Sequence, residues 1–220
     1  MRNLEIKNID CHTALAMTKN GQTDVLQCGR SMIEMLGVLA IIGVLSVGGI
    51  AGYSKAMQKY RINKTIEQIT QITTNTRTFF APQKNYNDFE CTLGGLEESD
   101  AKYKILKKAK IIPEEMWGDC YGSKKCVMNI FGGMYELEYE PKNENEIDGP
   151  YYTAFSLYLT ELPQEVCIEL GSLDWGNVAG SGLLKVSVNR IEATNIPMPI
   201  DAAVSACNCD NNCTLYLIYE

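Results

Sequence analysis

Residues 29–53 read GRSMIEMLGVLAIIGVLSVGGIAGY, and this stretch decides how the rest of the chain is interpreted. Residues 35–51 within it contain no charged side chain. As an α-helix, which rises about 1.5 Å per residue, they would extend roughly 25 Å, close to the hydrocarbon thickness of a bilayer. We therefore expect residues 32–53 to form a helix that can enter a membrane.

Glu34 adjoins this apolar run, where an ionisable side chain is costly unless it reaches water or a partner. It can be interpreted as a residue that extends to the membrane edge, or as one with a specific pairing role. A cleaved secretory signal is a further interpretation of the run. The run begins only after about thirty residues, however, and ends without a clear small-x-small cleavage site, so a signal peptide is disfavoured.

The segment of residues 29–36 resembles the cleavage and methylation motif of type IV prepilins, in which a glycine is followed five positions later by a glutamate. Gly43 and Tyr53 also fall where this family places a glycine and a tyrosine. The resemblance implies that residues 1–29 are a leader peptide. It implies too that prepilin peptidase, a membrane aspartyl peptidase, cuts between Gly29 and Arg30 and methylates the new amino group on Arg30.

The resemblance also implies a role for Glu34 in assembly, as the partner of a neighbouring subunit's N-terminal amine. A carboxylate and an ammonium that neutralise each other in a low dielectric would specify the axial register of otherwise apolar helices. Gly48 and Gly52 form a small-xxx-small pair suited to close helix packing, although glycine is common in membrane helices in general. We expect Gly43, Gly48, Gly52 and Tyr53 to take part in helix packing.

The sequence departs from the family pattern in three places. Arg30 stands where the family usually has a large apolar residue, Gln27 and Cys28 stand where a basic residue commonly precedes the glycine, and Ala51 replaces a frequent proline. The charges that flank the apolar run do not support a periplasmic head either. More basic residues follow the run than precede it, whereas the positive-inside rule expects the excess on the cytoplasmic side.

Beyond Tyr53 the sequence becomes amphipathic. Apolar and threonine side chains recur at three- and four-residue steps, as on one face of a helix, and Pro82 is expected to end that helix. We predict one helix over residues 30–81, with its second half, 54–80, lying across a globular head of residues 82–220. The residues of this face are Met57, Ile62, Ile66, Ile69, Thr73, Thr76 and Phe80.

Composition excludes several function classes. The chain has 220 residues, 45% of them apolar and 21% charged, which is ordinary for a protein with a packed core. A net charge of −7 disfavours nucleic acid binding. The single histidine, His12, lies upstream of the apolar run, so the head has no imidazole for Ser/His/Asp or Cys/His catalysis. We expect no enzyme and no cofactor.

The head carries a second resemblance, to the major pilins of the type IVb class. It rests on the sequence IIP at residues 111–113, predicted to break a short helix over 106–117, and on N-x-FGG at 129–133, predicted to lead into a strand ending at 140. Further strands are predicted over 151–160, 183–189 and 214–219, and a helix over 163–175. The fold class is therefore α+β, a long helix packed on an antiparallel sheet of about four strands.

Seven of the nine cysteines follow the apolar run, which suggests an oxidising compartment. The type IVb resemblance implies a disulfide between Cys167 and Cys207, closing a loop of about forty residues. Two further pairs are close enough in sequence for small loops, which would leave Cys91 alone, but sequence cannot fix the pairing. These pairs are Cys120 with Cys126 and Cys209 with Cys213.

A metal site is the rival interpretation of Cys207, Cys209 and Cys213. No histidine lies nearby and the spacing is not a usual zinc pattern, so we expect no metal.

The basic run at residues 102–110 could bind DNA or a host surface. A solvated helix face, with acidic patches on neighbouring subunits as partners, is the favoured interpretation, and no specific nucleic acid binding is predicted.

Together these features predict a structural filament subunit of the type IVb kind, held in the inner membrane by one helix before assembly and extracellular afterwards. Its expected partners are prepilin peptidase, copies of itself and the membrane assembly machinery. Adhesion, motility, aggregation or DNA uptake are possible outputs. A minor pilin or a type II secretion pseudopilin is the first alternative, and a membrane-tethered periplasmic binding domain is an alternative of another class.

Overall fold

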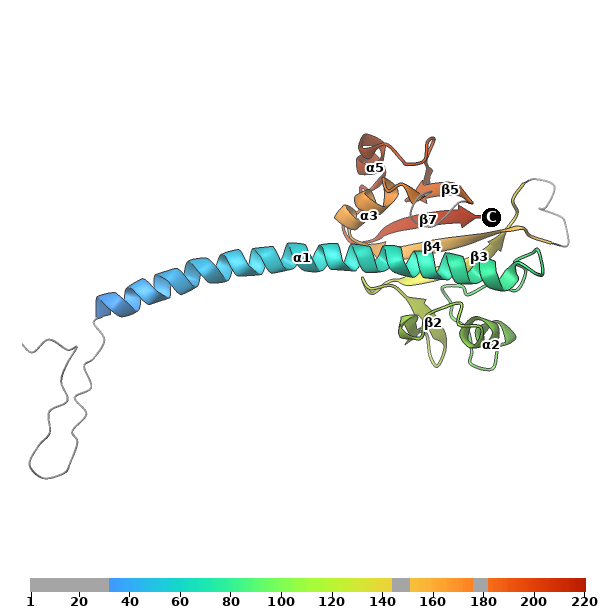
Figure 1. Ribbon diagram of the computed structural model, residues 1–220, viewed down its shortest axis with the longest axis horizontal. Helices are drawn as coiled ribbons and strands as arrows, with labels where there is room; N and C mark the ends of the chain where they lie inside the picture. The colour runs from blue at the N-terminus through green and yellow to red at the C-terminus, as the bar shows by residue number, and fades with distance from the viewer. Residues whose placement is uncertain (1–31, 144–150, 176–181) are drawn as a thin grey trace, which may run out of the picture. The chain divides into compact units, whose positions relative to one another are not determined.

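A computed structural model of the chain describes residues 32–143, 151–175 and 182–220 (Figure 1). The described residues fall into two units, one ending at Lys55 and one running from Ala56 to Glu220. Helix α1, Met32–Phe80, contributes residues to both units. Gly29 and Arg30, the predicted cleavage site, lie outside the described residues.

The long helix predicted from the sequence is confirmed by α1, which has 49 residues. No proline interrupts residues 32–81, and α1 ends two residues before Pro82, as the loss of a backbone donor predicts. Within the described ranges, α1 is the one helix long and apolar enough to cross a membrane by length and composition.

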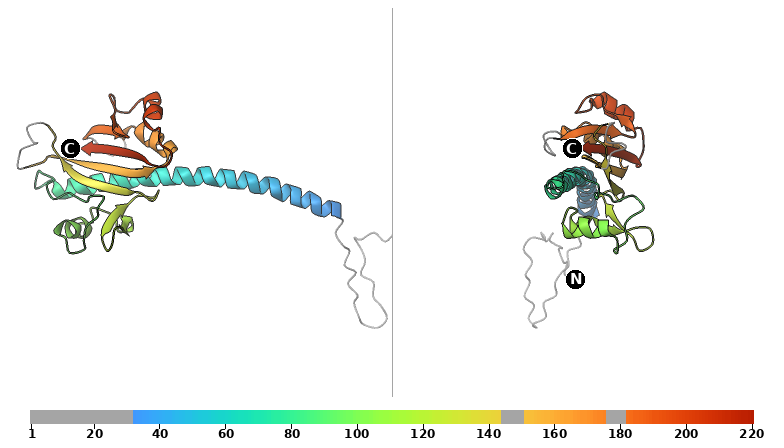
Figure 2. Two further views of the ribbon diagram at one scale, coloured as in Figure 1. Left: turned by 180° about the vertical axis from the view of Figure 1, so that it is seen from behind. Right: turned by 90° about the vertical axis from the view of Figure 1, so that its right-hand side faces the viewer.

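In the part of the chain that the structure describes, seven antiparallel strands form one sheet in the order β1-β2-β3-β4-β7-β5-β6. The second part of α1 lies against one face of this sheet, while α2 and α5 lie toward its opposite edges (Figures 1 and 2). The strands are β1 Trp117–Asp119, β2 Lys125–Met128, β3 Met134–Glu140, β4 Ala154–Leu162, β5 Leu183–Val188, β6 Ile191–Glu192 and β7 Cys213–Tyr219.

The predicted α+β class is confirmed, but the sheet is larger than the predicted four strands. The four expected strands correspond to β3, β4, β5 and β7. The others, β1, β2 and β6, have only three, four and two residues, too few to show an alternating pattern. Each of them pairs with a neighbouring strand in an antiparallel hairpin. The sequence could therefore indicate them only through the turn residues beside them, because they are too short to show a hydrophobic period.

The helix predicted over residues 106–117 is wrong in its bounds. Helix α2 is Ala101–Lys108, and a single 3-10 turn, Glu114–Met116, follows Pro113. Lys110 has a φ of 53°. Its N–H donates to Lys107 O (3.1 Å), and the N–H of Ile111 donates to Leu106 O (3.0 Å). This is a Schellman C-cap with lysine in the position that glycine usually takes, which the sequence pattern does not reveal.

Two other short helices lie in the described part of the head. Helix α3, Gln164–Gly171, is shorter than the predicted segment of residues 163–175. Helix α5, Ile200–Ala206, is absent from the prediction because its seven residues carry no clear apolar stripe. The N-cap positions of α3 and α5 are Pro163 and Pro199, whose fixed φ suits a helix start.

The core lies between α1 and the sheet. Leu137, Leu157, Leu217 and Val186 face one another across β3, β4, β7 and β5, and each is at most 1% exposed. Burying each such side chain contributes about 1.5–3 kcal/mol. On the predicted face of α1, Met57 and Ile66 are half-buried, and the other five members are fully buried: Ile62, Ile69, Thr73, Thr76 and Phe80. Thr65 and Ile72, which the prediction did not include, are fully buried as well.

Candidate functional site

The apolar part of α1 exposes its side chains. Ile33 is 81% exposed and Val47 is 72% exposed, in contrast to the buried isoleucines further along the same helix. The hydroxyls of Ser46 and Ser54 donate to the carbonyls four residues earlier, at 2.7 and 3.0 Å. Such back-bonding satisfies a hydroxyl inside lipid, where water is absent. This surface is chemically suited to a bilayer or to other helices.

The predicted packing glycines lie on this exposed part. A methyl group added at Gly43, Gly48 or Gly52 would meet no atom within 4 Å. The structure of the single chain therefore gives no packing reason for a glycine at these positions. Tyr53, at the end of the run, is 68% exposed.

Glu34 lies in the first turn of α1 and is exposed. A carboxylate in this position is favoured by the partial positive charge of a helix N-terminus. No ion pair or hydrogen bond involves its side chain within the described residues, which begin only two positions earlier. Its charge is therefore available to a partner outside the described chain.

The second part of α1 is tied to the head by polar contacts near both of its ends. Gln58 donates to the Glu165 carboxylate and Lys59 forms an ion pair with Glu169, both on α3. Near the far end, Arg77 Nε donates to the backbone carbonyl of Glu220 at 2.7 Å. Sequence reasoning missed these contacts because each joins residues more than one hundred positions apart.

Asn75 provides a further tie to the head. Its Nδ2 donates to Lys110 O (3.0 Å) and to Ile111 O (3.2 Å). These two carbonyls belong to the two residues that follow Ala109, the C-cap of α2, where the chain has left the helix. The side chain therefore fixes α2 against α1.

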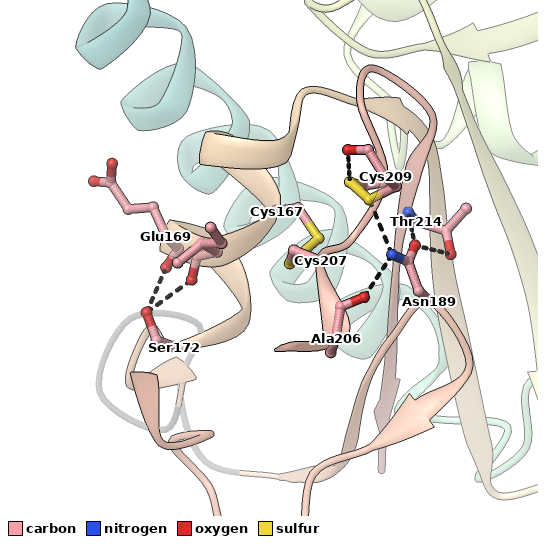
Figure 3. Close-up of a disulfide and its surroundings, with 10 residues drawn as sticks. Cys167, Glu169, Ser172, Asn189, Ala206, Cys207, Cys209 and Thr214 are labelled. Carbon is pink, nitrogen blue, oxygen red and sulfur yellow. Dashed lines mark hydrogen bonds between the residues drawn. A yellow bond between two sulfur atoms is a disulfide. The ribbon is translucent and has the colours of Figure 1, made fainter. Parts of the chain in front are cut away.

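Three disulfides occur within the described residues. Cys167 on α3 is bonded to Cys207 just after α5, across 40 positions and a Cα–Cα distance of 5.9 Å (Figure 3). The segment enclosed by this bond contains β5, β6 and α5. The two small-loop bonds join Cys120 to Cys126 and Cys209 to Cys213.

Asn189 organises the region beside this bond, and sequence reasoning missed it. Its Nδ2 donates to Ala206 O (2.8 Å), and its Oδ1 accepts from Thr214 N (2.8 Å), so one side chain connects the end of α5 with β7 (Figure 3). Asn189 and Arg190 have φ values of 47° and 68° and form the two-residue turn between β5 and β6. Asparagine tolerates this conformation, which is the signal that could have located the turn.

The sulfur atoms of Cys167, Cys209 and Cys213 lie within 4.8 Å of one another. All three are in disulfides, and a disulfide sulfur lacks the thiolate that binds a metal. Cys207, a member of the metal set considered from the sequence, is likewise in a disulfide.

Cys91 is buried and forms no disulfide. Burial raises the pKa of its thiol to about 12, which makes the thiol a weak nucleophile.

The basic run at residues 102–110 lies mostly on α2. Lys102 forms an ion pair with Glu90, and Lys107 pairs with Glu114 at 3.2 Å and donates to Tyr103 Oη at 2.9 Å. Several of its charges are thus used within the head. These acidic partners lie in the same chain, whereas the prediction placed them on neighbouring subunits, and the absence of nucleic acid binding stays a prediction.

A long helix with an exposed apolar part, and an antiparallel sheet packed on its amphipathic part, define a pilin-type subunit. A family model described as PilS N terminal matches residues 59–219, well over half of the chain. The chain therefore belongs to the PilS family of type IV pilins, and the predicted relationship to type IV pilins is confirmed.

Comparison with individual proteins adds little beyond the family. No curated protein matches the chain. Among solved structures, the crystal structure of a type IVb pilin from Salmonella typhi aligns with a TM-score of 0.48 and 15% identity, covering 72% of this chain and 97% of that one. Family membership therefore rests on the PilS match.

Proposed function

We propose that this pilin is a building subunit of a type IVb-like filament and that α1 holds it in the inner membrane before assembly. The observation that carries the proposal is the change of environment along α1: Ile33 is 81% exposed whereas Ile69 is fully buried in the head. Exposed apolar surface of this extent requires lipid or other protein to cover it. In a filament, the helices of neighbouring subunits would supply that cover.

Processing precedes assembly in this proposal. Prepilin peptidase cuts after Gly29 and methylates Arg30, which leaves a new N-terminal amine four residues before Glu34. The Glu34 carboxylate then pairs with the amine of a neighbouring subunit. In a low dielectric an unpaired carboxylate is strongly disfavoured, so the pair fixes the position of each helix along the filament axis. The head becomes extracellular with the filament.

The pairing role is tested by Glu34→Gln, which removes the charge and keeps the size of the side chain. We expect the variant to reach the inner membrane in normal amount but to be missing from sheared surface filaments. Asp201→Asn, a charge removal at an exposed position of α5, serves as the matched control and should assemble normally. Normal incorporation of Glu34→Gln would refute the pairing role and favour a membrane-tethered binding domain.

The cleavage site is tested on the same sheared material by N-terminal sequencing and intact mass. We expect a chain that begins at Arg30, with the mass of one added methyl group. Any other first residue would contradict the processing step. The abundance of the chain in purified filaments separates a major subunit from a minor pilin or pseudopilin.

A further inference from the structure

The face of the sheet that points away from α1 carries a row of polar and aromatic side chains. Tyr158 pairs with Glu136 on one side and with Tyr216 on the other, and Tyr216 pairs with Ser187. Directly opposed residues share a face, and the neighbouring rows, such as Leu137 with Leu157, face the core. In the view from behind, the strands lie in front of α1, so this face is not covered by that helix (Figure 2).

A groove of about 530 Å³ runs along this row. Carboxylates from β3 line one side of it, tyrosines from β4 and β7 line the middle, and Ser187 and Arg190 line the other side. The groove therefore spans four adjacent strands of one rigid sheet. Its volume is within the range of pockets that hold small molecules or single side chains of a partner.

The β3 side of the groove carries uncompensated negative charge. Glu136, Glu138 and Glu140 occupy alternate positions of the strand, and none forms an ion pair with a residue in the described ranges. Glu140 accepts hydrogen bonds from Tyr216 Oη (2.5 Å) and Ser156 Oγ (3.1 Å). Glu138 accepts none from the described chain. Burial, together with the like charges of Glu136 and Glu140, raises the pKa of Glu138, as expected for a carboxylate that lacks a cation.

The middle and far side of the groove supply complementary groups. The rings of Tyr158 and Tyr216 lie 6.1 Å apart at an interplanar angle of 69°, so two aromatic groups adjoin the carboxylates. Aromatic faces beside carboxylates are the combination that binds an ammonium group. Ser187 is only 8% exposed, yet its Oγ has no hydrogen-bond partner among the described residues. The hydroxyl is not among the fully enclosed unpaired polar atoms of the described residues, so it is open to the groove, where water or a ligand can bond to it.

We propose that this groove binds a lysine side chain presented by an extended peptide segment of a partner protein. The ammonium lies between the β3 carboxylates and the two tyrosine rings, and Ser187 and Arg190 contact carbonyl groups of the segment's main chain. Charge complementarity selects this occupant, since the carboxylates outnumber Arg190 in the groove. Lysine has three donors to share among Glu136, Glu138 and a tyrosine hydroxyl.

The inference is independent of filament assembly, because it concerns the unassembled head. It is tested with the full chain in a neutral detergent, by isothermal titration calorimetry with the acetylated and amidated tripeptide Gly-Lys-Gly. We expect saturable binding that weakens with added salt, because exposed charges are screened. The same peptide with an Nε-acetylated lysine should bind at least about tenfold more weakly, equivalent to about 1.4 kcal/mol.

Variants separate the groove from the overall negative charge of the chain. Glu138→Gln should weaken binding at least about tenfold, whereas Asp201→Asn, with the same change in charge, should leave it unchanged. Tyr158→Leu should weaken binding and Tyr158→Phe, which keeps the ring, should retain it. A cooperative thermal melt of Glu138→Gln at or above the wild-type melting temperature would establish that its fold is intact.

Three outcomes would overturn the proposal. These are equal binding of the acetylated peptide, equal loss in Glu138→Gln and Asp201→Asn, and absence of binding by a correctly folded chain. Titration with a neutral oligosaccharide tests whether the groove binds a sugar instead. Saturable binding of that sugar, with no binding of the lysine peptide, would assign the groove to a different ligand class.

Discussion

At the scale of single residues, the outward face of the sheet holds charge that the described chain does not neutralise. Glu138 lies between two other carboxylates on β3, and burial and these neighbours raise its pKa. In the unfolded chain the three side chains separate and regain full hydration. Folding is therefore opposed by the ionised form of Glu138 and not by its protonated form.

This predicts a specific pH dependence for Glu138→Gln. Because the folded-state pKa is above the unfolded value of about 4.3, the folded chain binds more protons between the two values, and the wild type loses stability as pH rises through this interval. The variant should be more stable than the wild type at pH 7. The difference should vanish below the unfolded pKa. Chemical denaturation of the full chain in detergent at pH 7 and pH 3.5 measures it.

A stabilisation by Glu138→Gln that is equal at both pH values would contradict this account, because it would then not arise from ionisation. Asp201→Asn provides the control for general charge removal. Its effect should be small, since an exposed carboxylate in the first turn of a helix contributes at most about 1 kcal/mol.

At the scale of elements, the segment from α3 to α5 is fixed in place by two different means. Asn189 connects it through hydrogen bonds at 2.8 Å, and Cys167–Cys207 closes it covalently. The two small-loop disulfides constrain only 6 and 4 positions, whereas this one constrains 40. In the chain-entropy account the longest loop restricts the unfolded ensemble most.

Removal of the long-range bond should therefore cost more than removal of a small-loop bond. We expect Cys167→Ala with Cys207→Ala to lower the free energy of unfolding by about 3–4 kcal/mol, and Cys120→Ala with Cys126→Ala to lower it by about 2 kcal/mol. Denaturant titrations under non-reducing conditions give both values. Peptide mapping of the unreduced protein, analysed by mass spectrometry, should recover the three bonded pairs; a different pairing would invalidate the comparison.

At the scale of the whole molecule, the division at Ala56 separates a unit with a buried core from a unit whose described apolar side chains are exposed. The unit from Ala56 to Glu220 has its own core, with Ile62, Ile69 and Leu157 at most 1% exposed. The described residues before it expose large apolar side chains and contain no buried core residue. A domain with its own core is expected to fold by itself.

A chain that begins at Ala56 should accordingly be monomeric and folded in buffer without detergent. The full chain should need detergent, because its exposed apolar side chains otherwise associate. Analytical ultracentrifugation and near-ultraviolet circular dichroism of both chains test this. Aggregation of the shorter chain would mean that the earlier part of α1 stabilises the head.

The sequence predicted the features that depend on short-range patterns. The motif around Gly29 and Glu34 identified the type IV pilins. Alternating side chains located β5 and β7, aromatic and β-branched composition located β4, and the N-x-FGG turn located β3. The C-cap at Lys110 escaped prediction because lysine rarely adopts a positive φ. The groove could not be predicted, since it depends on the register that sets Glu136, Tyr158, Tyr216 and Ser187 side by side from four separate strands.

The bond between Cys167 and Cys207 also determines what a protease can do to this protein. Residues 194–197, after β6, are exposed and lie within the segment that the bond encloses. A cut there breaks one peptide linkage, yet the two resulting fragments stay joined, because Cys167 precedes the cut and Cys207 follows it. The clipped subunit would still transmit tension from its first residue to its last, so damage at this surface need not sever a fibre built from it.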